Sequence, residues 1–165
     1  MDHKELQLTH FISIAKKEDV ELIVTFIDTF YRKDYFLPKK NVTRMVTGEV
    51  DERFGKARQP IYIWVSKDNE GISGVAFVTR SKTLIQLLIR PDCRKCGLGS
   101  YLLSIAAPEK IRCKTDVVTG DPTGFYMKNG YVGYQKTLDG TPAKTGKKNN
   151  ILLLDVKKDV IRQQR

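Results

Sequence analysis

The stretch Ile89–Ser100 carries residues whose types and spacing suit the binding of an anion. An apolar run ends at Pro91, and a short basic turn, Arg94–Lys95, is followed by glycines at positions 97 and 99. A helix predicted directly after this turn leaves its first amide groups without intrahelical acceptors, and its dipole favours negative charge there. Glycine has no side chain, so a phosphate can approach the backbone closely. The segment is therefore predicted to cradle a phosphate group.

Two other glycine-rich phosphate motifs do not fit the sequence. The dinucleotide-binding pattern needs a third glycine where Leu102 stands. The P-loop pattern fails because five residues separate Gly140 from Gly146, and Lys148 replaces the required serine or threonine. The turn at Ile89–Ser100 is thus neither of these motifs.

Cys93 and Cys96 form a C-x-x-C pair, which in other proteins binds zinc or does redox chemistry. A closed zinc site needs four nitrogen or sulfur ligands. The remaining candidates, Cys113, His3 and His10, are not at paired-ligand spacing. We therefore predict no metal, and interpret the two cysteines as small residues of a functional loop.

The pattern of apolar residues and turn formers predicts the elements that position this turn. Helices are predicted at Val20–Tyr31, from Pro38 to about Gly55, at Leu98–Ala107 and at Thr123–Lys128. Strands are predicted at Leu6–Ile14, Ile61–Val65, Ile72–Thr79, Leu84–Ile89, Thr115–Thr119, Tyr131–Thr137 and Ile151–Val156. The order β-α-α-β-β-β-α-β-α-β-β predicts an α/β fold: a mixed central sheet of about six to seven strands with helices on both faces. The central hairpin argues against a doubly wound parallel sheet.

Length and composition fit one soluble domain over residues 1–165. The chain has 41% hydrophobic and 29% charged residues, which is an ordinary globular composition. No apolar run approaches the roughly 18–20 residues that span a bilayer, and the polar N-terminus lacks a signal-peptide pattern, so we expect a cytoplasmic protein. The formal net charge of +10 would attract polyanions, but it equally suits a phosphate-rich cofactor.

Two segments resemble signatures of the GNAT family of acyl-CoA N-acyltransferases, and the resemblance spans roughly residues 10–156. The segment Phe125–Tyr131 is similar to the Tyr-x-x-x-Gly-aromatic segment on the family's fourth helix. The family's acyl-CoA signature, V-x-P-x-x-[RQ]-x-x-G-x-[GA], is matched by Ile89, Pro91, Arg94, Gly97 and Gly99. The GNAT fold is the mixed sheet that the element order predicts.

The resemblance implies acetyl-CoA as the acyl donor and assigns residues to each part of it. The pantetheine arm would lie along Leu87, Leu88 and Ile89, where a strand-end amide would also hold the oxyanion of the reacting thioester. The pyrophosphate would lie on the backbone amides of Arg94, Lys95, Cys96, Gly97, Leu98, Gly99 and Ser100.

For catalysis, the motif position of Tyr126 implies that it donates a proton to the leaving thiolate. The general base is less defined, because the family's usual glutamate is missing. Asp116 could accept a proton through water, or it could be a solvated strand residue. Thr119 and Pro122 stand where the family has asparagine and alanine, which leaves one cofactor contact open.

The predicted function is transfer of an acetyl group from acetyl-CoA to a primary amine of a small molecule or a protein. The alternative is a basic nucleic-acid-associated protein, or a non-catalytic CoA-binding protein, on the same fold. Lys144, Lys147 and Lys148 lack interleaved aromatic residues for base stacking, so we expect no specific nucleic-acid partner. We also expect no membrane partner, and the sequence leaves open whether the chain forms a homodimer.

Overall fold

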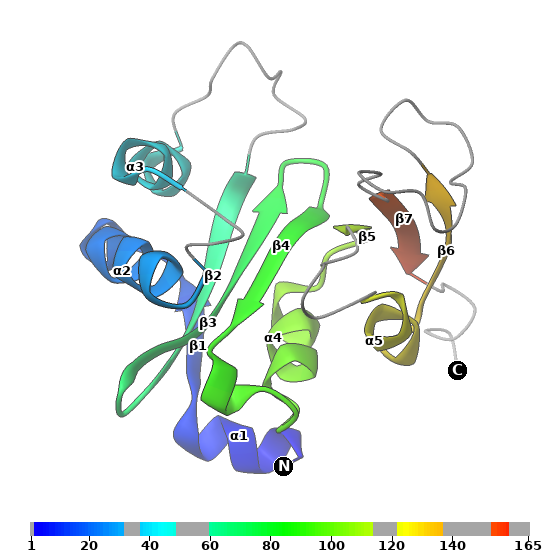
Figure 1. Cartoon of the computed structure of the whole chain (residues 1–165), viewed down its shortest axis with the longest axis horizontal. Coiled ribbons are helices and arrows are strands. Elements are labelled where there is room, and N and C mark those ends of the chain that lie inside the picture. Colours follow the sequence, from blue (N-terminus) through cyan, green and yellow to red (C-terminus); the bar gives the residue numbers. More distant parts are fainter. Residues whose placement is uncertain (1, 32–36, 49–59, 114–121, 137–152, 159–165) are drawn as a thin grey trace. The chain divides into compact units, whose positions relative to one another are not determined.

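The computed structural model describes residues 2–31, 37–48, 60–113, 122–136 and 153–158 (Figure 1). Its α-helices are α1 (His3–Thr9), α2 (Val20–Tyr31), α3 (Lys39–Thr47), α4 (Leu98–Ala106) and α5 (Thr123–Lys128). Its strands are β1 (Phe11–Ile14), β2 (Pro60–Asp68), β3 (Gly71–Thr79), β4 (Thr83–Ile89), β5 (Lys110–Cys113), β6 (Tyr131–Lys136) and β7 (Leu153–Lys158).

The chain divides into two compact units that share β4. One unit comprises Met1–Ser81 with Gln86–Ala107, and the other comprises Lys82–Ile85 with Pro108–Arg165. The single domain over residues 1–165 stays a prediction.

In the first unit the strands are neighbours in the order β1-β2-β3-β4. The predicted hairpin is confirmed, because β2 and β3 pair antiparallel from Pro60↔Thr79 to Asp68↔Gly71. Helices α2 and α3 pack on one face of these strands and α4 on the other, and α1 packs against α4 (Figure 1). The helices on each face bury apolar side chains. Those of Ile23 and Ile27 in α2 and of Leu98 and Leu102 in α4 are all fully buried. This packing fixes the end of β4 and the start of α4.

In the second unit, the first residues of β4 pair parallel with β5 at Thr83↔Lys110 and Leu84↔Ile111. Strand β7 then lies antiparallel between β5 and β6. Parallel and antiparallel pairs therefore occur together, which confirms the predicted mixed α/β fold.

Two local predictions differ from the structure, and a third is not tested by it. Residues His3–Thr9 form a helix instead of the start of a strand, because the Asp2 carboxylate accepts a hydrogen bond from the Glu5 amide at 2.9 Å and caps it. Helix α3 ends at Thr47, since Gly48 takes the left-handed conformation with φ 81°. The strand predicted at Thr115–Thr119 lies outside the described residues.

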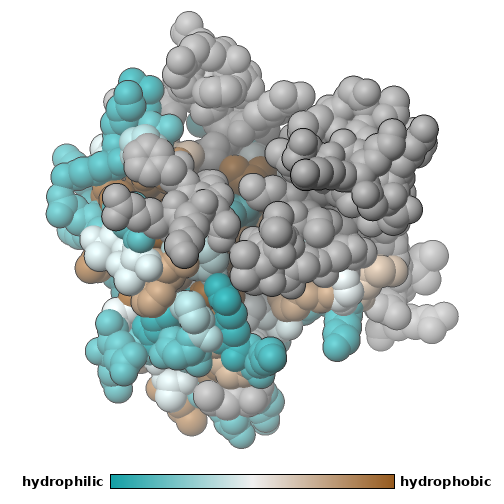
Figure 2. All heavy atoms as spheres, in the orientation of Figure 1, coloured by the Kyte–Doolittle hydropathy of each residue, from teal (hydrophilic) through white to brown (hydrophobic). Residues whose placement is uncertain are grey.

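Hydrophilic residues predominate on the described part of the face in Figure 2, with apolar residues scattered among them. Leu8 and Phe11 are the most exposed of the large apolar side chains, at 81% and 69%. Within the described ranges, no helix combines the length and apolar character needed to cross a membrane.

Candidate functional site

The start of α4 presents backbone amides that no described side chain caps. Gly97 is the N-cap residue and has φ 90°, and Lys95 in the turn before it has φ 64°. The first intrahelical hydrogen bond runs from the Tyr101 amide to the Gly97 carbonyl at 3.0 Å. The amides of Leu98–Ser100 precede that bond and have no acceptor within the helix. Helix α4 is nine residues long, and its dipole favours negative charge at this end. The residues fit a phosphate at this helix start.

A buried arginine holds the turn that leads into α4. The guanidinium of Arg90 donates to both carboxylate oxygens of Asp68, with 3.0 Å from Nη1 to Oδ1. It also donates to Asp92 Oδ1 at 2.6 Å, to the Ile72 carbonyl at 3.2 Å and to Cys93 Sγ at 3.3 Å. These contacts match the five N–H donors that an arginine carries. Arg90 thus connects the β2–β3 hairpin to the turn.

The charges of this cluster support one another. The hydrogen bond from Arg90 holds the pKa of Asp68 below its usual range, and the same bond raises the pKa of Arg90. Burial raises the pKa of the Cys93 thiol to about 11, so the thiol is neutral at physiological pH. The His10 ring forms a hydrogen bond with the Ser73 hydroxyl of β3, with 3.0 Å between Nδ1 and Oγ.

Ligand atoms of His10, Asp68 and Cys93 lie within 4.8 Å of one another, a grouping that could hold a metal ion. Two of the three are bonded to the Arg90 guanidinium, which already supplies the positive charge. A metal cation there would be repelled by that guanidinium. The cluster is therefore best described as a brace for the turn.

Tyr31, the last residue of α2, contacts the end of β4. Its hydroxyl donates to the Ile89 carbonyl at 2.5 Å and accepts from the Ile89 amide at 3.1 Å. Arg94 Nη2 donates to the Tyr31 hydroxyl oxygen at 2.9 Å, and the Arg94 guanidinium carbon lies 5.6 Å from the centre of the Tyr31 ring. A phenol oxygen has one proton and two lone pairs, and all are used.

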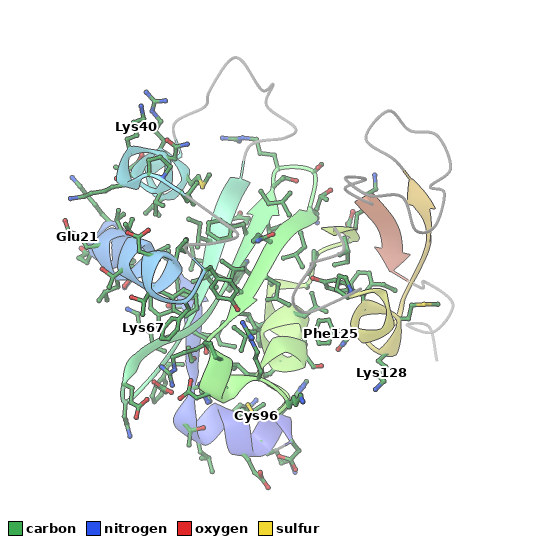
Figure 3. The ribbon with its side chains drawn as sticks, in the orientation of Figure 1. Glu21, Lys40, Lys67, Cys96, Phe125 and Lys128 are labelled. Carbon is green, nitrogen blue, oxygen red and sulfur yellow. The ribbon has the colours of Figure 1, made fainter. Side chains whose placement is uncertain are left out.

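The remaining residues predicted to hold the pyrophosphate lie around this turn. Arg94 and Lys95 are exposed, whereas Leu98 is fully buried and serves the core. Cys96, labelled in Figure 3, donates to the Cys93 carbonyl at 2.7 Å and packs against the apolar cluster that includes Leu6 of α1. The structure thus brings Ile89 and the segment Arg94–Ser100 together in the first unit. Of the residues assigned to the arm, Leu88 is buried and Leu87 is half-buried.

Tyr126, the predicted proton donor, belongs to the second unit. Tyr126 lies on α5 and is 6% exposed. Its ring meets Phe125, also labelled in Figure 3, with 5.1 Å between centroids, and meets Tyr131 edge-on at 6.4 Å. The Tyr126 amide donates to the Pro122 carbonyl at 3.2 Å, so Pro122 is the N-cap residue of α5. Asp116 lies outside the described residues.

Two residues of the site were missed by the sequence interpretation. Arg90 had a signal, because an arginine at the end of an apolar strand must find partners when it is buried, and Asp92 stands two residues later. For Tyr31, the sequence indicated the apolar face of a helix but no contact with Ile89. Only the packing of α2 on the sheet brings it to Ile89.

Residues 59–133 match the family model described as an acetyltransferase (GNAT) domain. No curated protein matches the chain. Solved structures share the fold at low identity. An acetyltransferase from Thermus thermophilus is 17% identical, with a TM-score of 0.60, 90% of this chain covered and 95% of the other.

Two further solved structures were determined with a ligand. The yncA protein from Salmonella typhimurium with its cofactor acetyl-CoA is 16% identical, with a TM-score of 0.58 and coverage of 90% of this chain and 93% of the other. The PaiA N-acetyltransferase from Thermoplasma acidophilum in complex with coenzyme A is 15% identical, with a TM-score of 0.58 and coverage of 91% and 99%. Residues 59–133 thus match a GNAT acetyltransferase domain, and the chain shares the mixed α/β fold of these GNAT acetyltransferase structures.

Proposed function

We propose that the protein is a cytoplasmic N-acetyltransferase that transfers the acetyl group of acetyl-CoA to a primary amine. The observation that carries this proposal is the start of α4, where uncapped amides follow a left-handed glycine and Arg90 braces the turn from beneath. Backbone amides at a helix start suit a pyrophosphate. Arg94 and Lys95 add positive charge at the exposed rim of the turn.

The end of β4 would hold the arm and the reacting carbonyl. The Ile89 amide and carbonyl point away from β3, because the next residue, Arg90, donates its own amide to the Ser73 carbonyl on β3 at 2.8 Å. An extended ligand that carries amide groups can pair with such a strand edge. The Ile89 amide is then the donor we assign to the developing oxyanion, where one such donor contributes about 3 kcal/mol.

Tyr126 is the residue we assign to proton donation. A tyrosine ordinarily has a pKa of about 10 and a cysteine-like thiol one of about 8.5, so complete proton transfer to the thiolate is uphill by roughly 2 kcal/mol. A hydrogen bond from the phenol to sulfur as charge develops needs no complete transfer. Asp116 remains our candidate for the base that takes the amine proton through water.

The direct test is thermal unfolding of the full chain with and without acetyl-CoA. A ligand at about 100 times its Kd stabilises a protein by roughly 2.7 kcal/mol, which raises Tm by on the order of 5–10 °C at this length. Gly99→Asp should melt normally without ligand and show no such rise, because it places a negative charge at the phosphate. A melting curve of the unaltered protein that saturating acetyl-CoA leaves unmoved would refute the proposal.

The chemistry is tested by a screen of amine acceptors that follows release of free thiol. Once an acceptor is found, Tyr126→Phe should lower kcat by tens- to hundreds-fold and leave the affinity for acetyl-CoA unchanged. Tyr62→Phe, a half-exposed tyrosine on β2, is the matched control and should keep full turnover. Unchanged turnover in Tyr126→Phe would mean that Tyr126 only packs on Tyr131.

A further inference from the structure

The end of β4 carries a contact that the proposed reaction does not use. The edge of β4 away from β3 offers the amide and carbonyl of Ile89, and the Tyr31 hydroxyl takes both. A hydroxyl that donates to a carbonyl and accepts from the amide of the same residue reproduces the pairing that an extended chain makes with a strand edge. Tyr31 therefore occupies the position on Ile89 that an incoming strand-like ligand would use.

We propose that Tyr31 is a specificity-determining residue that competes with the acyl arm of acetyl-CoA for the backbone of Ile89. This inference rests on the proposed function, which places that arm along the end of β4. The Ile89 amide has a single proton, so it cannot make full hydrogen bonds to the phenol and to an acyl carbonyl at the same time. Binding of the arm must move the Tyr31 hydroxyl from the strand edge.

Arg94 connects this competition to the phosphate end of the ligand. In the structure its guanidinium is exposed, donates to the Tyr31 hydroxyl at 2.9 Å and lies over the ring. A phosphate at the start of α4 would offer Arg94 a charged acceptor, which makes a stronger hydrogen bond than a neutral phenol. Withdrawal of Arg94 removes one of the bonds that hold the hydroxyl. A complete acyl-CoA is thus favoured over a ligand that has only its arm or only its phosphates.

The test compares Tyr31→Phe with the unaltered protein by calorimetric titration with two ligands. Acetyl-CoA carries the arm, whereas the nucleotide half of CoA keeps the pyrophosphate and lacks the arm. Tyr31→Phe keeps the ring and frees Ile89, so acetyl-CoA should bind about five- to tenfold more tightly, in line with the loss of one competing hydrogen-bond set. The nucleotide half should change by less than about twofold. Tyr62→Phe should leave both affinities unchanged.

Hydrogen exchange gives a second readout that does not depend on affinity. Without ligand, the Ile89 amide should exchange faster in Tyr31→Phe than in the unaltered protein, and acetyl-CoA should restore its protection in both. Fluorine NMR of the unaltered sequence grown with fluorotyrosine should show one tyrosine signal that moves slightly with the nucleotide half, as Arg94 leaves the Tyr31 ring, and moves further with acetyl-CoA, as the hydroxyl leaves Ile89. This measurement needs no substitution, so it holds even where Tyr31→Phe folds poorly.

The outcomes separate this inference from the proposed function. Equal or weaker binding of acetyl-CoA by Tyr31→Phe overturns the competition and leaves the acetyltransferase proposal intact. An equal gain for both ligands also overturns it, because the effect would then come from release of Arg94 alone. Failure of the unaltered protein to bind acetyl-CoA overturns both.

Discussion

The turn between β4 and α4 and the turn between α5 and β6 are held in different ways. At the first turn, Arg90 reaches Asp68 and the Ile72 carbonyl, which lie 22 and 18 residues earlier in the chain. At the second turn, the Asn129 side chain donates to the Phe125 carbonyl four residues earlier at 2.8 Å, and the Gly130 amide donates to Met127 at 3.1 Å. Both turns carry a motif of the proposed reaction.

The difference bears on how each motif tolerates substitution. A turn tied to a distant hairpin by buried charges keeps one geometry, as a phosphate cradle requires, and it depends strongly on each partner. A turn built from neighbouring residues and edge-to-face aromatic contacts depends on local helix formation. Four sets of measurements test this contrast, from the largest expected effect to the smallest.

Arg90→Gln should cost about 3 kcal/mol of the free energy of unfolding, because it leaves the Asp68 carboxylate without its buried counter-charge. That loss lowers Tm by about 6–12 °C at this chain length. The control is Lys39→Gln, whose exposed ion pair with Glu21 should leave Tm unchanged. Thermal and urea unfolding of both variants give the comparison. Equal Tm values would show that the Arg90 cluster does not brace the turn.

Alkaline pH should destabilise the first turn through Cys93. Because burial raises the pKa of this thiol from about 9 to about 11, the unfolded chain loses its proton first and stability falls as pH rises between these values. From pH 8 to pH 10, the unaltered protein should lose about 1 kcal/mol more than Cys93→Ala does. In the second unit, burial raises the pKa of Tyr131 to about 12, so the loss of stability caused by Tyr131 begins at a higher pH than the loss caused by Cys93. Urea unfolding at each pH measures the stability of the unaltered protein and of Cys93→Ala. Equal losses in these two proteins would contradict the assignment to Cys93.

Gly97→Ala and Gly130→Ala probe the two turns with the same change. The backbone φ is 90° at Gly97 and 89° at Gly130, so a Cβ should cost roughly 1 kcal/mol of stability at each. Only Gly97→Ala should also reduce the rise in Tm caused by acetyl-CoA. Thermal unfolding with and without ligand distinguishes them, and a reduced ligand effect in Gly130→Ala would place the phosphate elsewhere.

Gly124→Ala should stabilise α5 by about 0.5–1 kcal/mol, because alanine is the better helix former and no neighbouring heavy atom lies within 4 Å of its Cβ. The matched change in the first unit is Gly74→Ala, whose Cβ would lie 2.9 Å from Ile89 Cδ1 and 3.3 Å from the Leu88 carbonyl oxygen. That variant should lose about 1 kcal/mol through crowding. Urea unfolding measures the stability of both variants. A loss of stability in Gly124→Ala would show that close packing is not confined to the first unit, and a gain in Gly74→Ala would show that it is absent there.

Local patterns predicted much of the fold. The hairpin, the apolar strand that ends at Ile89, the helix at Leu98–Ala106 and the short helix at Thr123–Lys128 all follow from spacing and turn residues within a few positions. The start of α1 was missed because the cap contributed by Asp2 outweighed the loose alternation of Leu6–Ile14. The wrong prediction at α1 therefore also has a local cause.

The candidate site divides along the same line. The sequence by itself determined that Gly97 would precede a helix with uncapped amides, because left-handed turns and helix starts depend on adjacent residues. Only the tertiary structure decided that Arg90 meets Asp68 and that Tyr31 reaches Ile89, since these contacts join residues 22 and 58 positions apart. Spacing rules describe one strand or one helix at a time, whereas the packing of α2 and the β2–β3 hairpin on the sheet selects which distant polar groups satisfy one another.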